Sequence, residues 1–262
     1  MLKTTNLQFQ HSTHFEIDAI DLTIEKGEII SLIGPNGSGK STFLRLIARL
    51  LNPDAGTVLL EGQSIHSIER KKLAQQLAML PQMNDHQLDL TVGELIEFGR
   101  SPHVNKYGRM SEEDYGIVEW ALEVTSLTKY RDRVLPSLSG GERQRAWIAM
   151  AIAQRPKVLL LDEPTTYLDI SHQLEVMELV KALNEQLGMT IVMVLHDINQ
   201  AARYSDRLIV MKKGKVQYDG TPQCVLCREM FQNIFEIDAS IYEEAGTTFF
   251  TPTKMTTRCV FT

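Results

Sequence analysis

Residues 34–41 read "GPNGSGKS" and lie between two segments of different pattern. The stretch that ends at Ile33 is continuously apolar, which is typical of a strand buried on both faces. Beyond the loop, apolar residues recur at helical spacing from Phe43 to Leu50. A glycine-rich loop between a strand and a helix is the context in which the pattern GxxxxGK[ST] binds nucleotide phosphates. We therefore predict a phosphate-binding loop here, rather than an ordinary glycine-rich turn.

Each residue type in this loop has a role in holding phosphates. Glycines allow consecutive backbone N–H groups to converge on phosphate oxygens, and the helix N-terminus adds the positive end of its dipole. We expect Lys40 to neutralise charge on the β- and γ-phosphates and Ser41 to ligate Mg²⁺. The predicted ligands are ATP and Mg²⁺. The predicted phosphate-binding residues are Gly34, Pro35, Asn36, Gly37, Ser38, Gly39, Lys40, Ser41 and Thr42.

Two adjacent acids end a second apolar run, "VLLLDEP". Asp162 and Glu163 are expected at the carboxyl end of a buried strand, where open α/β sheets bind their ligands. We predict that Asp162 holds Mg²⁺ through a water and that Glu163 orients or deprotonates the attacking water. Without a phosphate loop elsewhere in the chain, a surface pair that caps a helix would be the better interpretation.

Isolated polar residues end two further predicted strands: Gln82 in "MLPQMN" and His196 in "VLHD". Each is a candidate to reach the γ-phosphate, and Gln82 is also a candidate metal ligand. A histidine that ends an apolar strand is, taken alone, more often a hydrogen-bonded structural residue. The motifs around His196 favour the catalytic interpretation.

The stretch "SLSGGERQ" looks like a second phosphate cradle. Ser139 and Glu142 fit the S/T-x-x-E capping box, so a well-formed helix start is a sufficient explanation of the pattern. However, Gly140 and Gly141 would leave the N–H groups of the first turn accessible to an anion.

Strand and helix signals alternate along most of the chain. Residues 157–162 and 190–196 read as buried strands separated by an amphipathic helix that ends at Gly188, which is a βαβ unit. From Leu90 to about Gln154 the pattern is mostly helical, and residues 207–220 read as a closing hairpin. We predict an α/β domain with a parallel sheet, N-terminal antiparallel strands and an inserted helical subdomain.

Composition and charge exclude several classes of protein. The 262 residues are 43 % hydrophobic, yet the longest apolar runs fall far short of the ~20 residues that a membrane-spanning helix needs. No secretory signal pattern begins the chain, so we expect a cytoplasmic location. The formal net charge of −6 disfavours nucleic acid as a partner. The cysteines suit reduced thiols better than disulfides or a zinc site; they are Cys224, Cys227 and Cys259.

In their order along the chain, these motifs resemble an ABC-type ATPase domain over nearly its whole length. The motifs are "GPNGSGKS", Gln82, "LSGGERQR", "VLLLDEP", "TTYLD" and His196, and "LSGGE" separates this family from other phosphate-loop proteins. The resemblance implies a phosphate-loop NTPase (RecA-like) core with a β subdomain over 1–85 and 155–225. It also implies a helical insert over 86–154 that carries the signature motif, and a C-terminal extension over 226–262.

The same resemblance implies roles for individual residues. Residues 139–142 would cradle the ATP held by another chain's phosphate loop, which makes a head-to-tail homodimer with two composite sites. Asp169 would communicate between the two sites, and Pro81-Gln82 would link toward a membrane partner. The family's adenine-stacking aromatic is replaced at this spacing by His11, with Phe9 and Phe15 nearby.

Three stretches resemble more narrowly the ATPase subunits of importers for ferric siderophores, haem and cobalamin: "VGELIEFGRSPHV", "GERQRAWIAMAIAQ" and "EPTTYLD". We expect a peripheral subunit at the cytoplasmic face of the cell membrane. It would drive a separate permease that imports an iron chelate, supplied indirectly by a substrate-binding protein. The alternatives are a soluble ABC ATPase that acts on an assembly or translation factor, and the ATPase subunit of an exporter.

Overall fold

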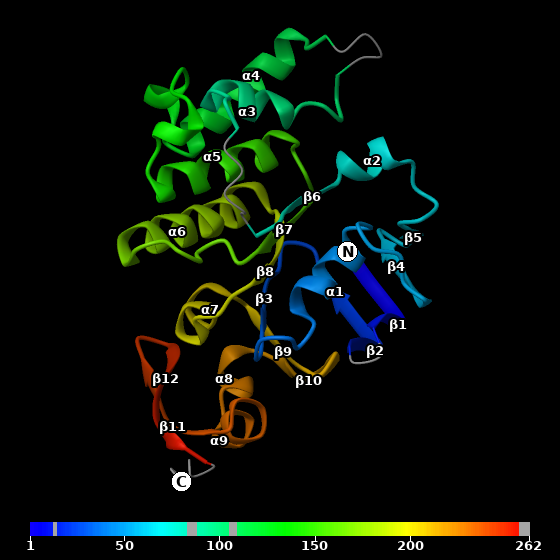
Figure 1. The fold of residues 1–262 in the computed structure, drawn as a ribbon, viewed down its shortest axis with the longest axis vertical. Helices are drawn as coiled ribbons and strands as arrows, with labels where there is room; N and C mark the ends of the chain where they lie inside the picture. The colour runs from blue at the N-terminus through cyan, green and yellow to red at the C-terminus, as the bar shows by residue number, and fades with distance from the viewer. Residues whose placement is uncertain (13–14, 83–87, 105–108, 257–262) are drawn as a thin grey trace. The chain divides into compact units, whose positions relative to one another are not determined.

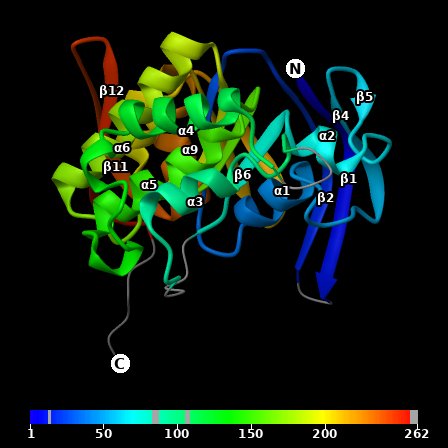
Figure 2. The same ribbon diagram turned by 90° about the horizontal axis from the view of Figure 1, so that it is seen from above.

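The structure is a computed structural model that describes residues 1–12, 15–82, 88–104 and 109–256, with the side chains of 11, 12 and 15 outside the description. The chain divides into two compact units (Figures 1 and 2). One consists of Met1–Gly62 with Val192–Thr262, and the other of Gln63–Ile191. Within the described ranges, none of the helices combines the length and the apolar character needed to cross a membrane.

The first unit begins with long antiparallel strands. These are β1 (Leu2–Ser12), β2 (Phe15–Ile24) and β4 (Ala55–Leu60), in the order β2-β1-β4. At the start of β1, Leu2 is level with Ile24 on one side and Leu60 on the other. All three side chains are buried, as expected of a sheet with one face on the core. The predicted N-terminal antiparallel strands are confirmed.

A parallel pair follows in the same unit. Strand β3 (Ile29–Ile33), whose five residues are all buried, pairs in parallel with β9 (Arg207–Lys212). Strand β9 continues into β10 (Lys215–Gly220) as the predicted hairpin. Helix α1 (Lys40–Ile47) follows β3, and α7 (Ile198–Tyr204) precedes β9.

The C-terminal segment, where the sequence pattern predicts no element, forms short helices and a hairpin. They are α8 (Pro222–Val225), α9 (Arg228–Met230), a π-helix (Phe231–Phe235), β11 (Ile237–Glu244) and β12 (Thr247–Met255). The side-chain amide of Asn199 on α7 donates to Phe250 O (3.2 Å) and accepts from Phe250 N (2.9 Å), as a neighbouring strand would. The Phe250 ring also stacks on Phe231 with centroids 4.4 Å apart. These contacts attach β12 to the unit.

The second unit contains the strands that carry the predicted acids. Its first elements are β5 (Gln63–Ser64), α2 (Arg70–Ala74), β6 (Leu77–Leu80) and β7 (Val158–Asp162). Strands β6 and β7 pair in parallel, with Leu80 level with Leu161. Strand β8 (Thr190–Val194) begins beside them, where Thr190 N donates to Lys157 O at 3.0 Å.

Helices make up the rest of this unit: α3 (Val92–Phe98), α4 (Glu112–Val124), α5 (Gly140–Ala153) and α6 (Ile170–Leu187), with 3₁₀ turns at Thr128–Tyr130 and Leu135–Ser137. Capping boxes at Thr91, Ser111 and Ser139 begin α3, α4 and α5, as their sequences predict. The division of the chain at 85, 154 and 225 stays a prediction.

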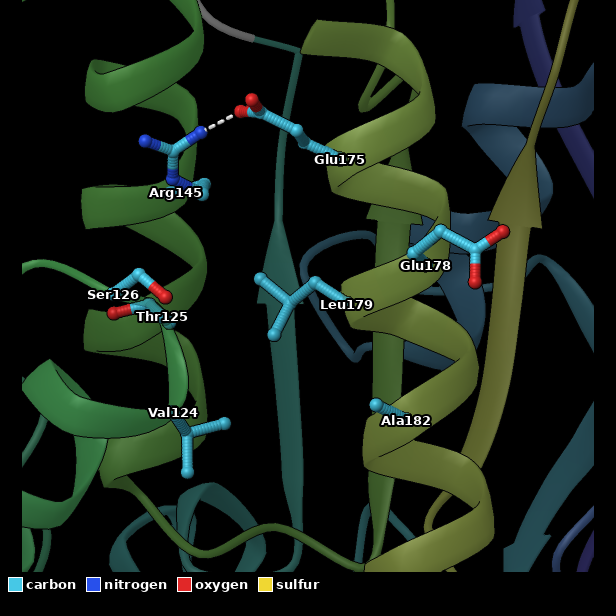
Figure 3. Close-up of a pocket in the computed structure, with 8 residues that line it drawn as sticks. All are labelled: Val124, Thr125, Ser126, Arg145, Glu175, Glu178, Leu179 and Ala182. Carbon is cyan, nitrogen blue, oxygen red and sulfur yellow. Dashed lines mark hydrogen bonds and ion pairs between the residues drawn. The ribbon is translucent and has the colours of Figure 1, made fainter. Parts of the chain in front are cut away.

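Helices α5 and α6 lie side by side, and with the end of α4 they line a cavity of about 410 Å³ (Figure 3). Arg145 on α5 forms an ion pair with Glu175 on α6 across the cavity wall. The lining contains none of the predicted site residues. It consists of Val124, Thr125, Ser126, Arg145, Glu175, Glu178, Leu179 and Ala182.

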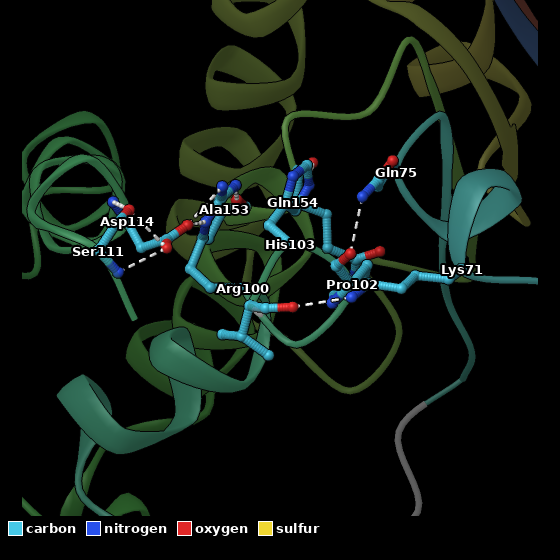
Figure 4. A network of polar contacts seen from close by, with 10 residues as sticks. Lys71, Gln75, Arg100, Pro102, His103, Ser111, Asp114, Ala153 and Gln154 are labelled. Carbon is cyan, nitrogen blue, oxygen red and sulfur yellow. Dashed lines mark hydrogen bonds and ion pairs between the residues drawn. The ribbon is translucent and has the colours of Figure 1, made fainter. Parts of the chain in front are cut away.

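Arg100, just after α3, joins three helices through a buried network (Figure 4). Its Nε and Nη2 donate to Asp114 Oδ1 at 2.9 and 2.8 Å, and Nη1 donates to Ala153 O at 2.5 Å. Burial raises the pKa of Asp114, but hydrogen bonds from Ser111 and Arg100 outweigh it and hold the pKa at about 2. Asp114 is therefore ionised at neutral pH and pairs with the guanidinium.

The residues after Arg100 extend the network toward α2. His103 Nε2 lies 2.8 Å from Gln154 O. Gln75 donates to Pro102 O and Lys71 to Val104 O, each at 2.7 Å. The segment 100–104 therefore ties α2, α4 and α5 together.

We predict that Asp114→Ala lowers the free energy of unfolding by about 3–5 kcal/mol, because it leaves a buried guanidinium without its partner. Urea unfolding at pH 7 measures the change. Because the pKa of Asp114 is depressed, this contribution is expected to be present above about pH 4 and to be lost as the pH falls toward about 2.

Glu113→Ala is the matched control, since Glu113 is exposed on the same turn of α4. It is expected to change the unfolding free energy by less than about 1 kcal/mol. An equal loss in both variants would contradict a stabilising role for the Arg100–Asp114 pair.

Candidate functional site

The loop after β3 depends on backbone conformations that favour glycine. Gly34 has φ 145° and Gly39, which begins α1, has φ 103°. A Cβ on Gly34 would lie 2.1 Å from the carbonyl oxygen of Met211 on β9. Any larger residue would push the loop away from β9, so the close approach requires glycine.

The predicted phosphate-binding lysine is buried against its own loop. Lys40 is 6 % exposed, and its Nζ donates to Gly34 O at 2.8 Å and to Pro35 O at 3.1 Å. On the outer side, Ser38 O accepts from Gly214 N at 3.0 Å. The loop therefore holds an ammonium group across its backbone, and phosphate oxygens are stronger partners for that group than carbonyls.

The start of α1 differs from that of the other helices that carry functional candidates. Side-chain oxygens cap α5, α6 and α7, whereas Gly39 supplies no side-chain cap. Ser38 Oγ, next to it, is buried without a hydrogen-bond partner among the described residues. Uncapped first-turn amides, a buried hydroxyl and a lysine fit a bound phosphate chain.

Parallel strands bring Gln82 and Glu163 together in the second unit. Because Leu80 and Leu161 are level, the residues two positions beyond them leave the sheet at the same edge. Gln82 Nε2 donates to Glu163 Oε2 at 2.8 Å. Asp162, the last residue of β7, is 2 % exposed. The structure thus places two of the predicted catalytic residues in direct contact.

Glu163 is held in an uncommon backbone conformation, with φ 56°. Thr166 Oγ1 donates to the same carboxylate oxygen as Gln82, at 3.1 Å. Two donors therefore fix the direction of the Glu163 side chain. Sequence reasoning missed Thr166; its only signal is a hydroxyl three residues beyond the acid.

The signature segment forms the capping box that its sequence predicts. Glu142 N donates to Ser139 Oγ at 3.2 Å, and Ser139 N donates to Glu142 Oε2 at 2.9 Å. Hydrogen bonds from Tyr130 and then Ser139 lower the pKa of Glu142. Gly140 and Gly141 form the first turn of α5, as the predicted cradle requires.

The remaining predicted residues lie at the ends of elements. Asp169 caps α6, where its Oδ1 accepts from His172 N at 2.9 Å. His196 is exposed just beyond β8, and Asp197 after it caps α7. His11 lies on β1, but its side chain is outside the described part of the structure, so its stacking on adenine stays a prediction.

Comparison with known proteins gives a consistent family. The sequence profile of the ABC transporter family matches residues 17–166. The petrobactin import ATP-binding protein FpuC of Bacillus anthracis is 62 % identical over 255 residues, 97 % of this chain and 94 % of that protein. The iron(3+)-hydroxamate import ATP-binding protein FhuC of Bacillus subtilis is 45 % identical, over 94 % of this chain and 91 % of that protein.

Solved structures have the same fold. An ABC transporter described as of metal-chelate type, in an inward-facing conformation, matches with a TM-score of 0.83 at 28 % identity, over 96 % of this chain and 97 % of that one. A dimeric structure of the ATP-binding cassette MJ0796 with ADP and Pi matches with a TM-score of 0.72 at 33 % identity, over 85 % of this chain and 99 % of that one. The predicted fold class is confirmed. The family profile and these long alignments place this chain in the ABC transporter family, as one of its ATP-binding, ATP-hydrolysing subunits.

Proposed function

We propose that this chain powers a separate membrane permease that imports an iron(III) chelate of the siderophore class. The observation that carries the proposal is the 62 % identity, along 97 % of the chain, with a protein named for petrobactin import. A second relative is named for iron(3+)-hydroxamate import. In this role the chain acts as a peripheral subunit at the cytoplasmic face of the membrane.

We assign ATP binding to the phosphate loop, residues 34–42. The uncapped start of α1 and the buried Lys40 support this assignment. Ser41, Gln82 and Asp162 are the proposed ligands of Mg²⁺, directly or through water. The chemistry that Mg²⁺ supplies when bound is neutralisation of phosphate charge.

Glu163 is the proposed general base. Its carboxylate orients a water and accepts the proton as the water oxygen bonds to the γ-phosphorus; the bond to the β–γ bridging oxygen breaks, and ADP and phosphate leave. Two donors, Gln82 and Thr166, hold one oxygen of this carboxylate and so fix its direction. His196 is the proposed contact to the γ-phosphate.

We propose a head-to-tail homodimer in which residues 139–142 of one chain cradle the ATP of the other. Large apolar side chains beside Asp169 support a protein contact there: Tyr167 is 91 % exposed and Ile170 is 78 % exposed. Both are costly to leave in water, and a second chain would cover them.

We predict that Glu163→Gln binds ATP and hydrolyses it at least about a hundredfold more slowly, since the amide keeps the shape of the side chain and cannot accept the proton. Phosphate release measures turnover, and gel filtration with ATP measures the closed dimer, which should accumulate. Glu185→Gln, at an exposed position on α6, is the control and is expected to turn over normally. Turnover near that of the unsubstituted chain would remove Glu163 from the role of base.

A mixed dimer tests whether the two cradles act across the interface. One chain carries Lys40→Ala, the other carries Ser139→Arg, and both carry Glu163→Gln so that ATP is retained. If the cradles are shared, one composite site collects both defects and the other is intact, so the doubly tagged dimer traps about one ATP. Each homodimer, with a defect in every site, is the control and should trap none. A count near zero in a heterodimer that forms would leave residues 139–142 as a helix cap alone.

Growth tests the cargo. Deleting the gene is expected to abolish growth on a siderophore-class iron chelate as the sole iron source, and free iron in excess is expected to restore it. The complementing gene with Glu163→Gln is the control and should not rescue uptake. Equal loss of growth in iron-replete medium would contradict the importer role, and normal chelate uptake with loss of another nutrient would change the cargo.

A further inference from the structure

The first turn of α6 lies against the glycine pair that begins α5. A Cβ on Gly141 would lie 2.0 Å from Cδ2 of His172 and 2.4 Å from its Cγ. A Cβ on Gly140 would lie 3.4 Å from Cδ2 of Leu168. Gly141 is inside a helix, where alanine is the better helix former. The imidazole of His172, and not the backbone, therefore requires glycine at position 141.

The same imidazole is hydrogen-bonded to Asp169. His172 Nδ1 lies 2.7 Å from Asp169 Oδ1, which also accepts from the His172 backbone and from Ser171 Oγ, each at 2.9 Å. Hydrogen bonds from the His172 backbone, the Ser171 hydroxyl and the His172 ring, in that order, lower the pKa of Asp169. An ionised carboxylate only accepts hydrogen bonds, so Nδ1 carries the proton here. One ring thus touches two of the motifs assigned to the dimer.

A second contact holds the same two helices one turn further along. Arg145, four residues after Gly141, pairs with Glu175, three residues after His172 (Figure 3). Residues three and four apart lie on one helix face. The facing sides of α5 and α6 are therefore joined at successive turns, and at the first of them His172 is the only side chain of the contact.

We propose that His172 is a positioning residue that fastens the Asp169 segment to the Gly140–Gly141 cradle, so that both surfaces meet the second chain as one rigid piece. This inference rests on the proposed homodimer. His172 acts through its two neighbours, and the phosphate loop contains none of these residues. Loss of the ring should therefore weaken closure of the dimer without weakening the first capture of ATP.

His172→Ala tests this expectation with two readouts. The affinity of the monomeric chain for ATP should stay within about twofold, as for a substitution away from the ligand. In a Glu163→Gln background, the Kd of the ATP-loaded dimer should rise about tenfold or more, the scale of one charge-assisted hydrogen bond. In the catalytic chain, kcat should fall by a similar factor at a fixed chain concentration.

Two variants separate positioning from general damage. His172→Asn keeps an N–H donor near the place of Nδ1 and should recover most of the dimer affinity. Ser171→Ala removes another hydrogen bond to the same oxygen of Asp169 without touching Gly141, and should stay within about twofold of the unsubstituted chain. Urea unfolding of every variant identifies a change that comes from lost stability.

A compensating pair tests the contact itself. Gly141→Ala places a methyl group in the imidazole and should impair dimer closure. Adding His172→Ala leaves only the His172 Cβ, 2.8 Å from the new methyl, where the ring was at 2.0 Å. The double variant should therefore close better than Gly141→Ala alone, a non-additive result that requires direct contact.

The outcomes are distinguishable. Dimer closure by His172→Ala that matches the unsubstituted chain would overturn the inference and leave the proposed function in place. A double variant no better than Gly141→Ala would also overturn it. If the Glu163→Gln chain with no other change fails to dimerise in ATP, the proposed homodimer fails and the inference falls with it. If His172→Ala does not fold, His172→Asn and the Gly141 pair decide the matter.

Discussion

A helix N-terminus without a side-chain cap is the constraint on which the nucleotide site depends. In this chain a side-chain oxygen satisfies the first turn of α3, α4, α5, α6 and α7, but Gly39 leaves the amides of α1 for another partner. The loop can present those amides because Gly34 lies so close to Met211 O that no side chain fits there. Lys40, folded onto two carbonyls of the loop, supplies the charge. Three separate features thus fit one anion, which is stronger support than the glycine pattern alone.

The hydrolytic carboxylate is built on strain and pairing together. Glu163 adopts a left-handed conformation that costs a non-glycine residue about 1–2 kcal/mol, and such residues persist only where their surroundings hold them. Here the holding groups are Gln82 and Thr166, which donate to one oxygen of the carboxylate. Gln82 arrives from β6 because β6 and β7 are parallel and in register. A slip of the register by one residue would turn Gln82 to the other face of the sheet.

The segment that most resembles iron-chelate importers has a structural explanation in this chain. Arg100 joins α4 to the end of α5, and the backbone of Pro102 and Val104 receives donors from the α2 region. These residues organise the helices of the second unit and contain no group that would recognise an iron chelate. The cargo assignment therefore depends on the relatives that share the whole chain, and the motif is better understood as part of the scaffold that the relatives have in common.

Local patterns determined much of this protein from the sequence alone. The phosphate loop, three capping boxes, the hairpin of β9 with β10 and the order β7, α6, β8 each depend on residues close together in the chain, so periodicity, glycines and caps predict them. Tertiary structure decided what no spacing encodes. Gln82 bonds to Glu163 across 81 positions, His172 fills the space that Gly141 leaves, and Asn199 holds β12 from 51 residues away. Thr166 and the C-terminal hairpin escaped the sequence analysis for the same reason. Hydrogen bonding and packing between distant residues depend on how strands pair and helices cross, and a single sequence records those pairings only through the side chains that finally meet.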